Sequence, residues 1–356
     1  MIKLRVLYDH QTFYQKIGGV SRYFTGMFPF LEKLGSKINL SCYFSNNIYL
    51  ENRKVKKFFP FFDSHKKNQL MQSINEYFSM KIIKKGNYDV FHPTQYQTYF
   101  INKIEKPYVV TIHDMVSEIY DIDSVNTKNK KVIIQKANKI IAISENTKMD
   151  ILKYFPEINP EKITVIHHGY YQKTYNIISN KYGNYILFVG MRSGYKNFNK
   201  FLDAIIPILQ NDLSLNLVCT GKPFDDSELE KMKLVNILTR CHSAHFSDRE
   251  LFSLYKFAKV FVFPSLYEGF GFPILEAFRN NCPACISNAS CFPEIAGDAA
   301  LYFDPSSVSS IRESVKKLIY SPKLANKLRE KGKVRVKEFS LEKSAKLHYE
   351  LYKSVC

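Results

Sequence analysis

The stretch Phe261-Val-Phe-Pro-Ser-Leu-Tyr-Glu-Gly-Phe-Gly-Phe-Pro-Ile-Leu-Glu276 joins three kinds of local sequence. Its apolar beginning is typical of a central strand in a parallel sheet. A loop with two glycines follows, which lets the backbone approach a ligand closely, and the next proline suits the first turn of a helix. A helix start attracts an anion such as a diphosphate, while the carboxylates of Glu268 and Glu276 can accept hydrogen bonds from hydroxyl groups. A nucleotide sugar carries both kinds of group.

Strand and helix patterns alternate along the rest of the chain, in two series. In the first half, we expect strands at about 3–9, 38–44, 88–92, 107–112, 139–143 and 163–167, and helices at about 20–34, 68–84, 126–138 and 145–154. In the second half, we expect strands at about 185–190, 215–220, 235–239, 260–264, 283–287 and 300–303, and helices at about 197–210, 226–232, 247–257, 273–280 and 307–319. Such alternation predicts an α/β protein with two doubly wound, Rossmann-like domains. The polar segment 170–184 is the expected hinge.

Length and charge limit the kinds of function. At 356 residues the chain is too long for one ordinary core. It has 51 Lys and Arg against 33 Asp and Glu, a formal net charge of +18, so we expect an anionic partner: a nucleotide diphosphate, a nucleic acid or an anionic membrane surface. The first residues have a short strand pattern rather than a secretory signal, and no apolar run reaches membrane-spanning length. A cytoplasmic protein is expected.

The seven cysteines form no even framework of the kind that disulfide-bonded proteins have. Cys282-Pro-Ala-Cys285 has the spacing of a metal or redox pair, but the chain offers no further ligands at matching spacing. We expect buried free thiols and no metal on these cysteines.

The spacing from Glu268 to Glu276 resembles the E-x(7)-E signature of the family 4 retaining glycosyltransferases of the GT-B class. Other motifs resemble the same family in the same order: Gly18-Gly19-Val20-Ser21-Arg22-Tyr23, His113-Asp114, Ser144-Glu145-Asn146-Thr147, His168-Gly169, Val189-Gly190-Met191-Arg192 through Lys196-Asn197, and Ser287-Asn288 through Pro293-Glu294. The resemblance implies two domains that face a central cleft. Residues 1–175 would form the acceptor-side domain, 338–356 would pack back on it, and 176–337 would bind the nucleotide sugar.

Two cations, Arg192 and Lys196, follow an apolar strand and are expected at the edge of the sheet where open α/β sheets bind ligands. The resemblance implies that they hold the donor phosphates and stabilise the leaving group. It also implies that Glu268 contacts sugar hydroxyls and that Glu276 binds the ribose. The other donor-binding residues implied by the family are Gly18, Gly19, Gly269, Phe270, Gly271 and Phe272. The amides of Gly18 and Gly19 could instead approach the acceptor.

His113 ends another apolar strand, and the resemblance makes it the active-site histidine that hydrogen-bonds the transferred sugar. The expected catalytic set is therefore His113, Arg192, Lys196 and Glu268. Asp114 either orients the imidazole or only begins the next loop, and His167 or His168 is expected to line the cleft. The pair Asp121-Ile-Asp123 has the spacing of a metal-dependent transferase, but it lies several residues past its strand, so chance spacing is favoured. No metal and no cofactor other than the nucleotide-sugar donor is expected.

Residues 53–85 contain nine Lys and Arg, two acids and several aromatic residues. This composition suits contact with an anionic membrane, or a solvated helix beside an ordinary buried aromatic cluster. It also suits single-stranded nucleic acid. We expect no nucleic-acid partner. The rings of Phe58, Phe59, Phe61 and Phe62 could enter a membrane if they are exposed.

The resemblance implies a retaining transferase, and our best estimate is mannose transfer from GDP-mannose to a lipid-linked surface polysaccharide such as an O-antigen of lipopolysaccharide. Such an enzyme would be peripheral on the inner face of the plasma membrane. Alternative donors are UDP-Gal, UDP-Glc, UDP-GlcNAc and dTDP-rhamnose. A nucleotide-sugar epimerase on the same scaffold is a further alternative, but it needs an additional acid/base set that the sequence does not show.

Overall fold

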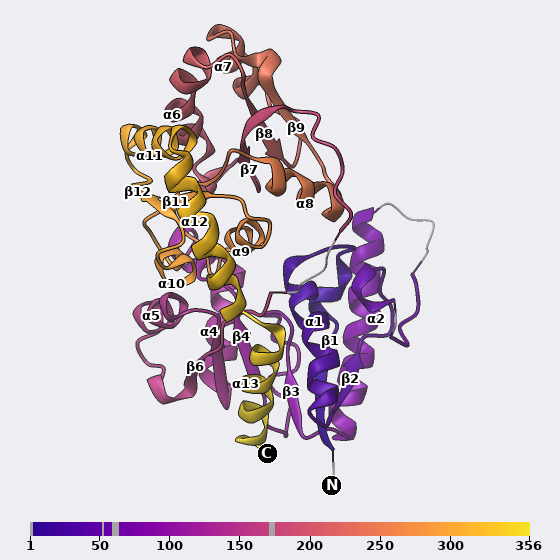
Figure 1. Cartoon of the computed structure of the whole chain (residues 1–356). Coiled ribbons are helices and arrows are strands. Elements are labelled where there is room, and N and C mark those ends of the chain that lie inside the picture. Colours follow the sequence, from indigo (N-terminus) through magenta and orange to yellow (C-terminus); the bar gives the residue numbers. More distant parts are fainter. Residues whose placement is uncertain (1–2, 52, 59–63, 171–174) are drawn as a thin grey trace. The chain divides into compact units, whose positions relative to one another are not determined.

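The computed structural model describes residues 3–51, 53–58, 64–170 and 175–356 (Figure 1). Internal contacts divide the chain into two compact units. The first unit consists of Met1–Tyr171 and Phe339–Cys356, and the second of Gln172–Glu338. Part of the expected hinge, residues 171–174, lies outside the described residues.

The strands of the first unit are all parallel. They are β1 Leu4–Asp9, β2 Ser36–Ser41, β3 Val90–His92, β4 Val109–Ile112, β5 Lys139–Ala142 and β6 Ile163–Val165. They pair in the orders β2-β1-β3 and β4-β5-β6, and a parallel bridge between Phe91 and Tyr108 links β3 to β4. The combined order is therefore 2-1-3-4-5-6, which reverses between β1 and β3.

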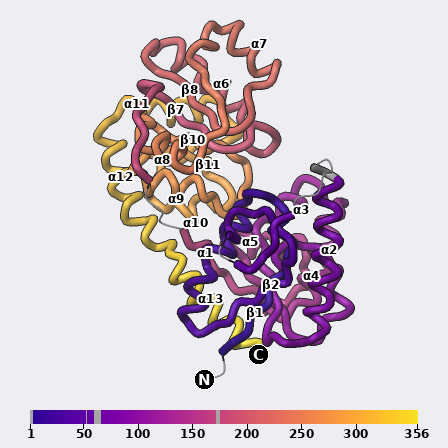
Figure 2. The backbone as a smooth tube through the Cα atoms, turned by 90° about the vertical axis from the view of Figure 1, so that its right-hand side faces the viewer, coloured from indigo at the N-terminus to yellow at the C-terminus, as the bar shows by residue number. Residues whose placement is uncertain are grey.

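Helices of the first unit come from both ends of the chain. They are α1 Gly19–Lys33, α2 Ser64–Lys85, α3 Val116–Tyr120, α4 Val125–Lys136, α5 Glu145–Tyr154 and α13 Leu341–Lys353, with 3-10 turns η1 Gln11–Tyr14, η2 Ile48–Leu50 and η3 Pro160–Lys162. Although α13 follows the second unit in sequence, it packs beside α1 (Figures 1 and 2). A Cβ on Gly169 would lie 2.4 Å from the Cα of Leu341, so only glycine permits this approach of the chain to α13. Leu341 and Tyr352 of α13 are buried with Tyr8 and Phe24 in one apolar core.

The second unit has one parallel sheet of six strands in the order β9-β8-β7-β10-β11-β12. The strands are β7 Asn184–Phe188, β8 Leu215–Thr220, β9 Cys241–Ala244, β10 Val260–Phe263, β11 Ala284–Ser287 and β12 Leu301–Phe303. The helices are α6 Phe198–Asn211, α7 Asp226–Leu234, α8 Asp248–Phe257, α9 Phe272–Arg279, α10 Phe292–Ala296, α11 Val308–Tyr320 and α12 Pro322–Arg335, with 3-10 turns η4 Gly194–Lys196, η5 Leu238–Arg240 and η6 Val336–Glu338. This 3-2-1-4-5-6 order is the doubly wound Rossmann order, and ligands bind such sheets where the order reverses, here between β7 and β10.

The predicted fold class, two Rossmann-like α/β units with parallel sheets, is confirmed. One predicted strand, 235–239, is wrong. Asn236 adopts a left-handed conformation (φ 57°), its N–H donates to Lys233 O, and the N–H of Ile237 donates to Met232 O. This is the Schellman arrangement that ends a helix, here α7, and the buried side chains of Ile237 and Met232 complete it. The apolar run is therefore a helix cap, and the strand β9 begins later, at Cys241.

The seven cysteines are free, and six of them are buried. Burial raises the pKa of the Cys282 thiol to about 12 and raises that of Cys285 further. Both thiols therefore stay protonated at neutral pH, which suits the expected role as apolar core residues.

Candidate functional site

Lys196 and Glu268 meet where the strand order of the second unit reverses. β7 and β10 are parallel neighbours, with Val260 paired to Ile186, so their carboxyl ends emerge side by side. The Nζ of Lys196, in the turn after β7, lies 2.5 Å from Oε1 of Glu268, in the loop after β10. The two side chains are only 14% and 16% exposed. A cation and a carboxylate thus stand together at the ligand-binding edge of the sheet.

Asn197 fixes the loops after β7 and β10 to each other. It is left-handed (φ 59°) and stands at the start of α6. Its Nδ2 donates to the carbonyl oxygens of Pro264 (3.1 Å) and Pro305 (2.8 Å). The N–H of Leu266 also donates to the carbonyl of Tyr195 at 2.7 Å. The position of Lys196 is therefore determined by backbone contacts as well as by its ion pair.

Arg192 is held by several protein acceptors. Its Nε donates to both carboxylate oxygens of Glu228 (2.9 and 3.1 Å), and the other nitrogens donate to Ser243 Oγ (3.0 Å) and Pro223 O (2.7 Å). The guanidinium also lies 4.7 Å from the ring centre of Phe224. Arg192 thereby ties the loop after β7 to the segments that follow β8 and to β9.

A pocket of about 560 Å³ opens beside Arg192 at the ends of β7, β8 and β9. Its lining residues are Gly190, Met191, Arg192, Ser193, Thr220, Gly221, Lys222, Pro223, Asp225, Glu228, His245, Phe246 and Leu251. This volume is within the range of ligand pockets. We did not predict Glu228 from the sequence. Its only local signal is the capping box that it forms with Asp225 at the start of α7, which indicates a helix start and not a partner for Arg192.

The glycine loop after β10 leads directly into α9. Gly271 has φ +90°, and a Cβ there would lie 3.2 Å from Cδ1 of Ile274, so a side chain would be strained. Helix α9 starts at Phe272, whose ring centre is 5.4 Å from that of the buried Phe270. Glu276, in the second turn of α9, accepts a hydrogen bond from the Tyr255 hydroxyl at 3.1 Å. The predicted donor-binding residues after β10 thus lie on one short loop and one helix start.

Ser290 holds the backbone of Glu268 from the other side. Its Oγ donates to the Glu268 carbonyl (2.7 Å) and accepts from the Glu268 N–H (3.3 Å). Ser290 itself is left-handed, with φ 52°. We did not predict Ser290, because a serine 22 positions along the chain gives no sequence signal of this contact.

His113 follows β4 in the first unit. Its N–H donates to the Tyr96 hydroxyl (2.9 Å), which donates in turn to the Thr111 carbonyl (3.3 Å). Burial, with a contribution from the charge of Lys130, lowers the pKa of the imidazole to about 3. The ring is therefore neutral at physiological pH, and its buried Nε2 has no hydrogen-bond partner among the described residues. The free nitrogen of a neutral imidazole can donate one hydrogen bond to a ligand or accept one from it, depending on the tautomer.

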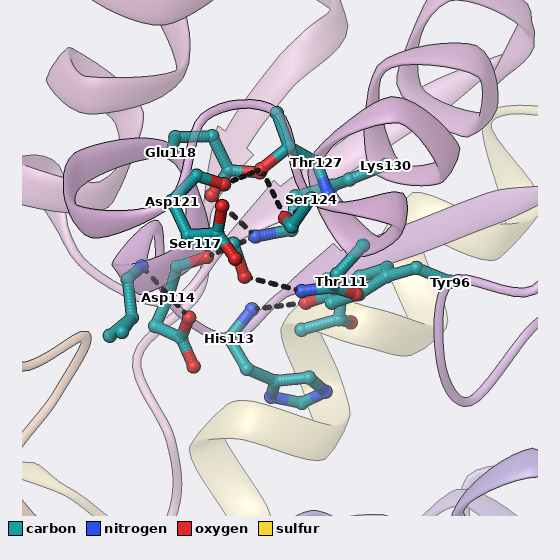
Figure 3. Close-up of polar contacts among 12 residues, drawn as sticks. Tyr96, Thr111, His113, Asp114, Ser117, Glu118, Asp121, Ser124, Thr127 and Lys130 are labelled. Carbon is teal, nitrogen blue, oxygen red and sulfur yellow. Dashed lines mark hydrogen bonds and ion pairs between the residues drawn. The ribbon is translucent and has the colours of Figure 1, made fainter.

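A completely buried ion pair lies beside the turn that follows His113 (Figure 3). Lys130 of α4 donates to Glu118 Oε2 of α3 (2.7 Å) and to the carbonyl of Asp114 (2.9 Å). In Figure 3 the imidazole of His113 points away from this pair. Lys and Glu are almost never fully buried unless paired, so these two residues were not expected here. The pair fixes the backbone that follows His113.

Other candidate residues of the first unit are also placed. Asp114 accepts the N–H of Val116 at 3.1 Å, so its carboxylate shapes the start of the next turn. His168 is buried with its ring stacked 5.5 Å from that of His113, whereas His167 lies beside Phe339, with ring centres 5.6 Å apart. Asp121 and Asp123 are both exposed, in the turn between α3 and α4.

Gly18 and Gly19 stand at the N-terminus of α1, with Gly18 extended (φ −167°). Both line a second pocket of about 440 Å³, at the end of β1 within the first unit. Their position at a ligand-sized pocket fits a binding role.

The basic and aromatic residues of segment 53–85 are partly buried and partly exposed. Phe58 is 8% exposed and its ring packs on Phe44 at 4.9 Å, so the exposure on which its insertion into a membrane depends is not met at this residue. Phe59, Phe61 and Phe62 lie outside the described residues. The ring of Phe78 stacks on Tyr43, while Tyr77 is 59% exposed. Within the described ranges, no helix is both long and apolar enough to cross a membrane.

Comparison with known proteins gives the same class for both units. Residues 17–171 match Glycosyltransferase Family 4, and residues 175–335 match Glycosyl transferases group 1. The solved structure of HepE from Anabaena, in complex with UDP and glucose, superposes with a TM-score of 0.74 at 15% identity, over 99% of this chain and 100% of that chain. The fold is that of the GT-B glycosyltransferases.

The chain is also similar in sequence to curated proteins that are named as mannosyltransferases. The O-antigen chain mannosyltransferase RfbU of Salmonella typhimurium is 28% identical over 222 residues, which cover 60% of this chain and 61% of that protein. The O-antigen chain mannosyltransferase B of Escherichia coli is 32% identical over 165 residues, 44% of this chain and 42% of that protein. The chain thus matches about three-fifths and two-fifths of the lengths of these relatives. It belongs to the family 4 glycosyltransferases of the GT-B class and is similar to their mannosyltransferases.

Proposed function

We propose that the protein is a retaining hexosyltransferase that moves mannose from GDP-mannose to a lipid-linked surface polysaccharide. The observation that carries the proposal is the Lys196–Glu268 pair beside the start of α9, where the strand order reverses. A cation for phosphate, a carboxylate for sugar hydroxyls and a helix start for the diphosphate lie there together. The choice of mannose rests on the named activity of RfbU and its homologues.

In this proposal Lys196 neutralises the charge that develops on the departing nucleoside diphosphate, while Glu268 accepts hydrogen bonds from the transferred sugar. Glu276 accepts hydrogen bonds from the ribose. Arg192 already donates to Glu228, Ser243 and Pro223 through three of its five N–H groups, so a phosphate can bind its guanidinium through the remaining N–H groups of the two terminal nitrogens. We assign Arg192 to shaping the phosphate loop as well as to phosphate contact.

The proposed chemistry uses no enzymic nucleophile. The bond from the anomeric carbon to the phosphate oxygen breaks, the acceptor hydroxyl attacks from the same face, and the departing phosphate oxygen takes the acceptor proton. His113, neutral because of its burial, offers its unused Nε2 to a hydroxyl of the transferred sugar. Because Lys196 and Arg192 supply the positive charge, we propose that no metal ion takes part.

The acceptor places the proposed reaction at the inner face of the plasma membrane. The lysines of residues 53–85 would bind anionic headgroups, each contributing about 1 kcal/mol near the surface. Exposed residues that support this proposal are Lys54, Lys56, Lys57, Lys66 and Tyr77.

A donor screen tests the function. GDP-mannose, UDP-Gal, UDP-Glc, UDP-GlcNAc and dTDP-rhamnose are each incubated with the protein and a lipid extract, and release of nucleoside diphosphate is measured. We expect release from GDP-mannose, and a loss of at least about tenfold in Glu268→Gln, because the variant removes a charged acceptor worth about 1.5–3 kcal/mol. Glu230→Gln, an exposed glutamate on α7 of the same unit, is the matched control. Equal rates in the two variants, or no release from any donor, contradict the proposal.

A further inference from the structure

The pocket at the end of β1 differs in composition from the rest of the chain. The lining residues are Gln11, Thr12, Tyr14, Gln15, Gly18, Gly19, Val20, Gln95, Tyr96, Gln97, Val125, Asn126 and Asn129. Charged residues make up 24% of the sequence, so about three of these thirteen would be expected to carry a charge. Among the described residues that line the pocket, none does. Although the chain has a net charge of +18, this pocket offers an anion no cationic side chain, only the backbone N–H groups at the start of α1.

The pocket of the second unit provides a contrast. It has the same number of lining residues, and they include Arg192, Lys222, Asp225 and Glu228. The pocket of the second unit offers a diphosphate cationic side chains. The polar groups of the pocket in the first unit are amides and hydroxyls, beside aromatic rings. The two pockets therefore suit different ligands.

Side-chain amides dominate the uncharged pocket, and several are available to a ligand. The side chains of Gln95, Gln97 and Asn129 make no hydrogen bond to any described residue. An amide both donates and accepts, as a sugar hydroxyl does, and carries no charge that needs a counter-ion. The rings of Tyr14 and Tyr96 add apolar surface of the kind that packs against the C–H face of a sugar ring.

A buried carboxylate holds two walls of the pocket in place. Asp9, which is 0% exposed, accepts hydrogen bonds from Gln11 Nε2 (2.6 Å) and Thr94 Oγ1 (2.7 Å). Gln11 in turn accepts the N–H of Gln97 (2.7 Å), and Thr94 accepts the N–H of Thr12 (3.0 Å). Because the turn after β1 and the loop after β3 share this carboxylate, the pocket is formed before any ligand arrives.

We propose that this pocket binds an uncharged saccharide unit of the acceptor through Gln95, Gln97 and Asn129. The inference rests on the proposed transferase function, since it names the part of the acceptor that this unit recognises. Gly18 and Gly19 line the same pocket and would lie beside acceptor hydroxyls. A phosphorylated or uronic acid unit would lack a cation there.

Binding of neutral trisaccharides to the full chain tests the proposal. A panel of hexose trisaccharides, including mannotriose, is compared with the corresponding 6-phosphates by saturation-transfer NMR at millimolar concentration, and GDP is titrated separately. We expect neutral sugars to bind more tightly than their phosphates. Gln95→Ala and Asn129→Ala should each weaken binding about threefold to tenfold, which corresponds to one lost neutral hydrogen bond. Gln69→Ala, an exposed amide on α2, is the control, and circular dichroism verifies that each variant is folded.

The two proposals fail in different ways. Tighter binding of the phosphates, no binding of any neutral trisaccharide, or equal affinity in Gln95→Ala, Asn129→Ala and Gln69→Ala overturns the saccharide site. GDP affinity should be unchanged in all three variants and should fall in Lys196→Ala, whose side chain lies in the other unit. Neutral sugars that bind as expected while GDP does not bind at all support the saccharide site and contradict the transferase.

Discussion

Lys130→Met is expected to destabilise the first unit strongly. The ammonium and the Glu118 carboxylate are both 0% exposed and lie 2.7 Å apart. Methionine keeps most of the volume but removes the charge, so the carboxylate is left buried without a counter-ion. Oε1 of Glu118 already has no hydrogen-bond partner among the described residues, so nothing else in its surroundings compensates. Breaking a buried pair on one side costs about 3–5 kcal/mol.

Two further variants separate the charge from the other contacts of Lys130. In Lys130→Met with Glu118→Leu no buried charge remains, and most of the stability should return. The carbonyl of Asp114 still lacks its donor, which leaves a deficit of about 1–3 kcal/mol. Lys131→Met is the control, because its pair with Glu157 is exposed (51% and 40%) and worth about 0–1 kcal/mol.

Amide hydrogen exchange read by mass spectrometry is the suitable assay, because a protein of two units need not unfold in one step. Peptides that contain β4 report on the first unit, and peptides that contain β10 report on the second. At about 1.4 kcal/mol for each factor of ten, Lys130→Met should speed exchange in β4 by at least roughly 100-fold and leave β10 unchanged. If β4 exchanges as slowly in Lys130→Met as in Lys131→Met, the buried pair does not hold this turn and our reasoning is wrong.

Four other outcomes are expected. Glu276→Ala should weaken nucleoside diphosphate binding by at least tenfold, since a charge-assisted bond is worth about 1.5–3 kcal/mol, and unchanged affinity in calorimetry would show that Glu276 does not hold the ribose. Transfer should persist after exhaustive chelation with EDTA, and a complete loss that magnesium or manganese restores would mean a metal enzyme. Burial lowers the pKa of His113 to about 3 and that of His348 to about 4, whereas the pKa of a histidine in the unfolded chain is about 6.5. The folded form therefore binds fewer protons than the unfolded form, and the stability of the first unit falls as the pH drops below about 6.5. At pH 5.5 the two together should cost about 3 kcal/mol, and a first unit that melts at the same temperature at pH 7.5 and 5.5 would contradict this. Replacing five lysines by glutamine should reduce co-sedimentation with anionic vesicles, and equal sedimentation would remove the membrane proposal; the five are Lys54, Lys56, Lys57, Lys66 and Lys67.

Much of the fold could be predicted because hydrophobic runs mark the strands of buried parallel sheets. Strand β8 was predicted with its observed bounds, and β7 and β10 were predicted within two residues. The error at 235–239 arose because a short run of apolar residues is compatible with a strand and also with the end of a helix. The sequence pattern alone does not distinguish the two. Helix α12 was not predicted separately, since its sequence is rich in charge and its apolar positions are few.

The candidate site was predictable where it follows strands. Lys196 and Glu268 lie in the segments that follow β7 and β10, and the sheet order brings these segments together. Contacts between residues that only tertiary packing brings together could not be predicted from any local sequence pattern. The partner of Arg192 is 36 positions away, and the Lys130–Glu118 pair joins two short helices whose polar residues would ordinarily be solvated. The roles of the predicted site residues remain predictions.

The docking of α13 has a consequence for the order of folding during synthesis. The second unit is continuous in sequence, whereas the first unit needs Phe339–Cys356, whose last residue the ribosome adds 185 residues after Tyr171 (356 − 171). At roughly 5–20 residues per second this delay lasts about 10–40 s. During that time Tyr8 and Tyr23 lack the Tyr352 and His348 side chains with which they hydrogen-bond in the finished protein, at 2.8 and 2.6 Å. The nascent chain therefore carries an incomplete, apolar α1 surface while the second unit can already fold.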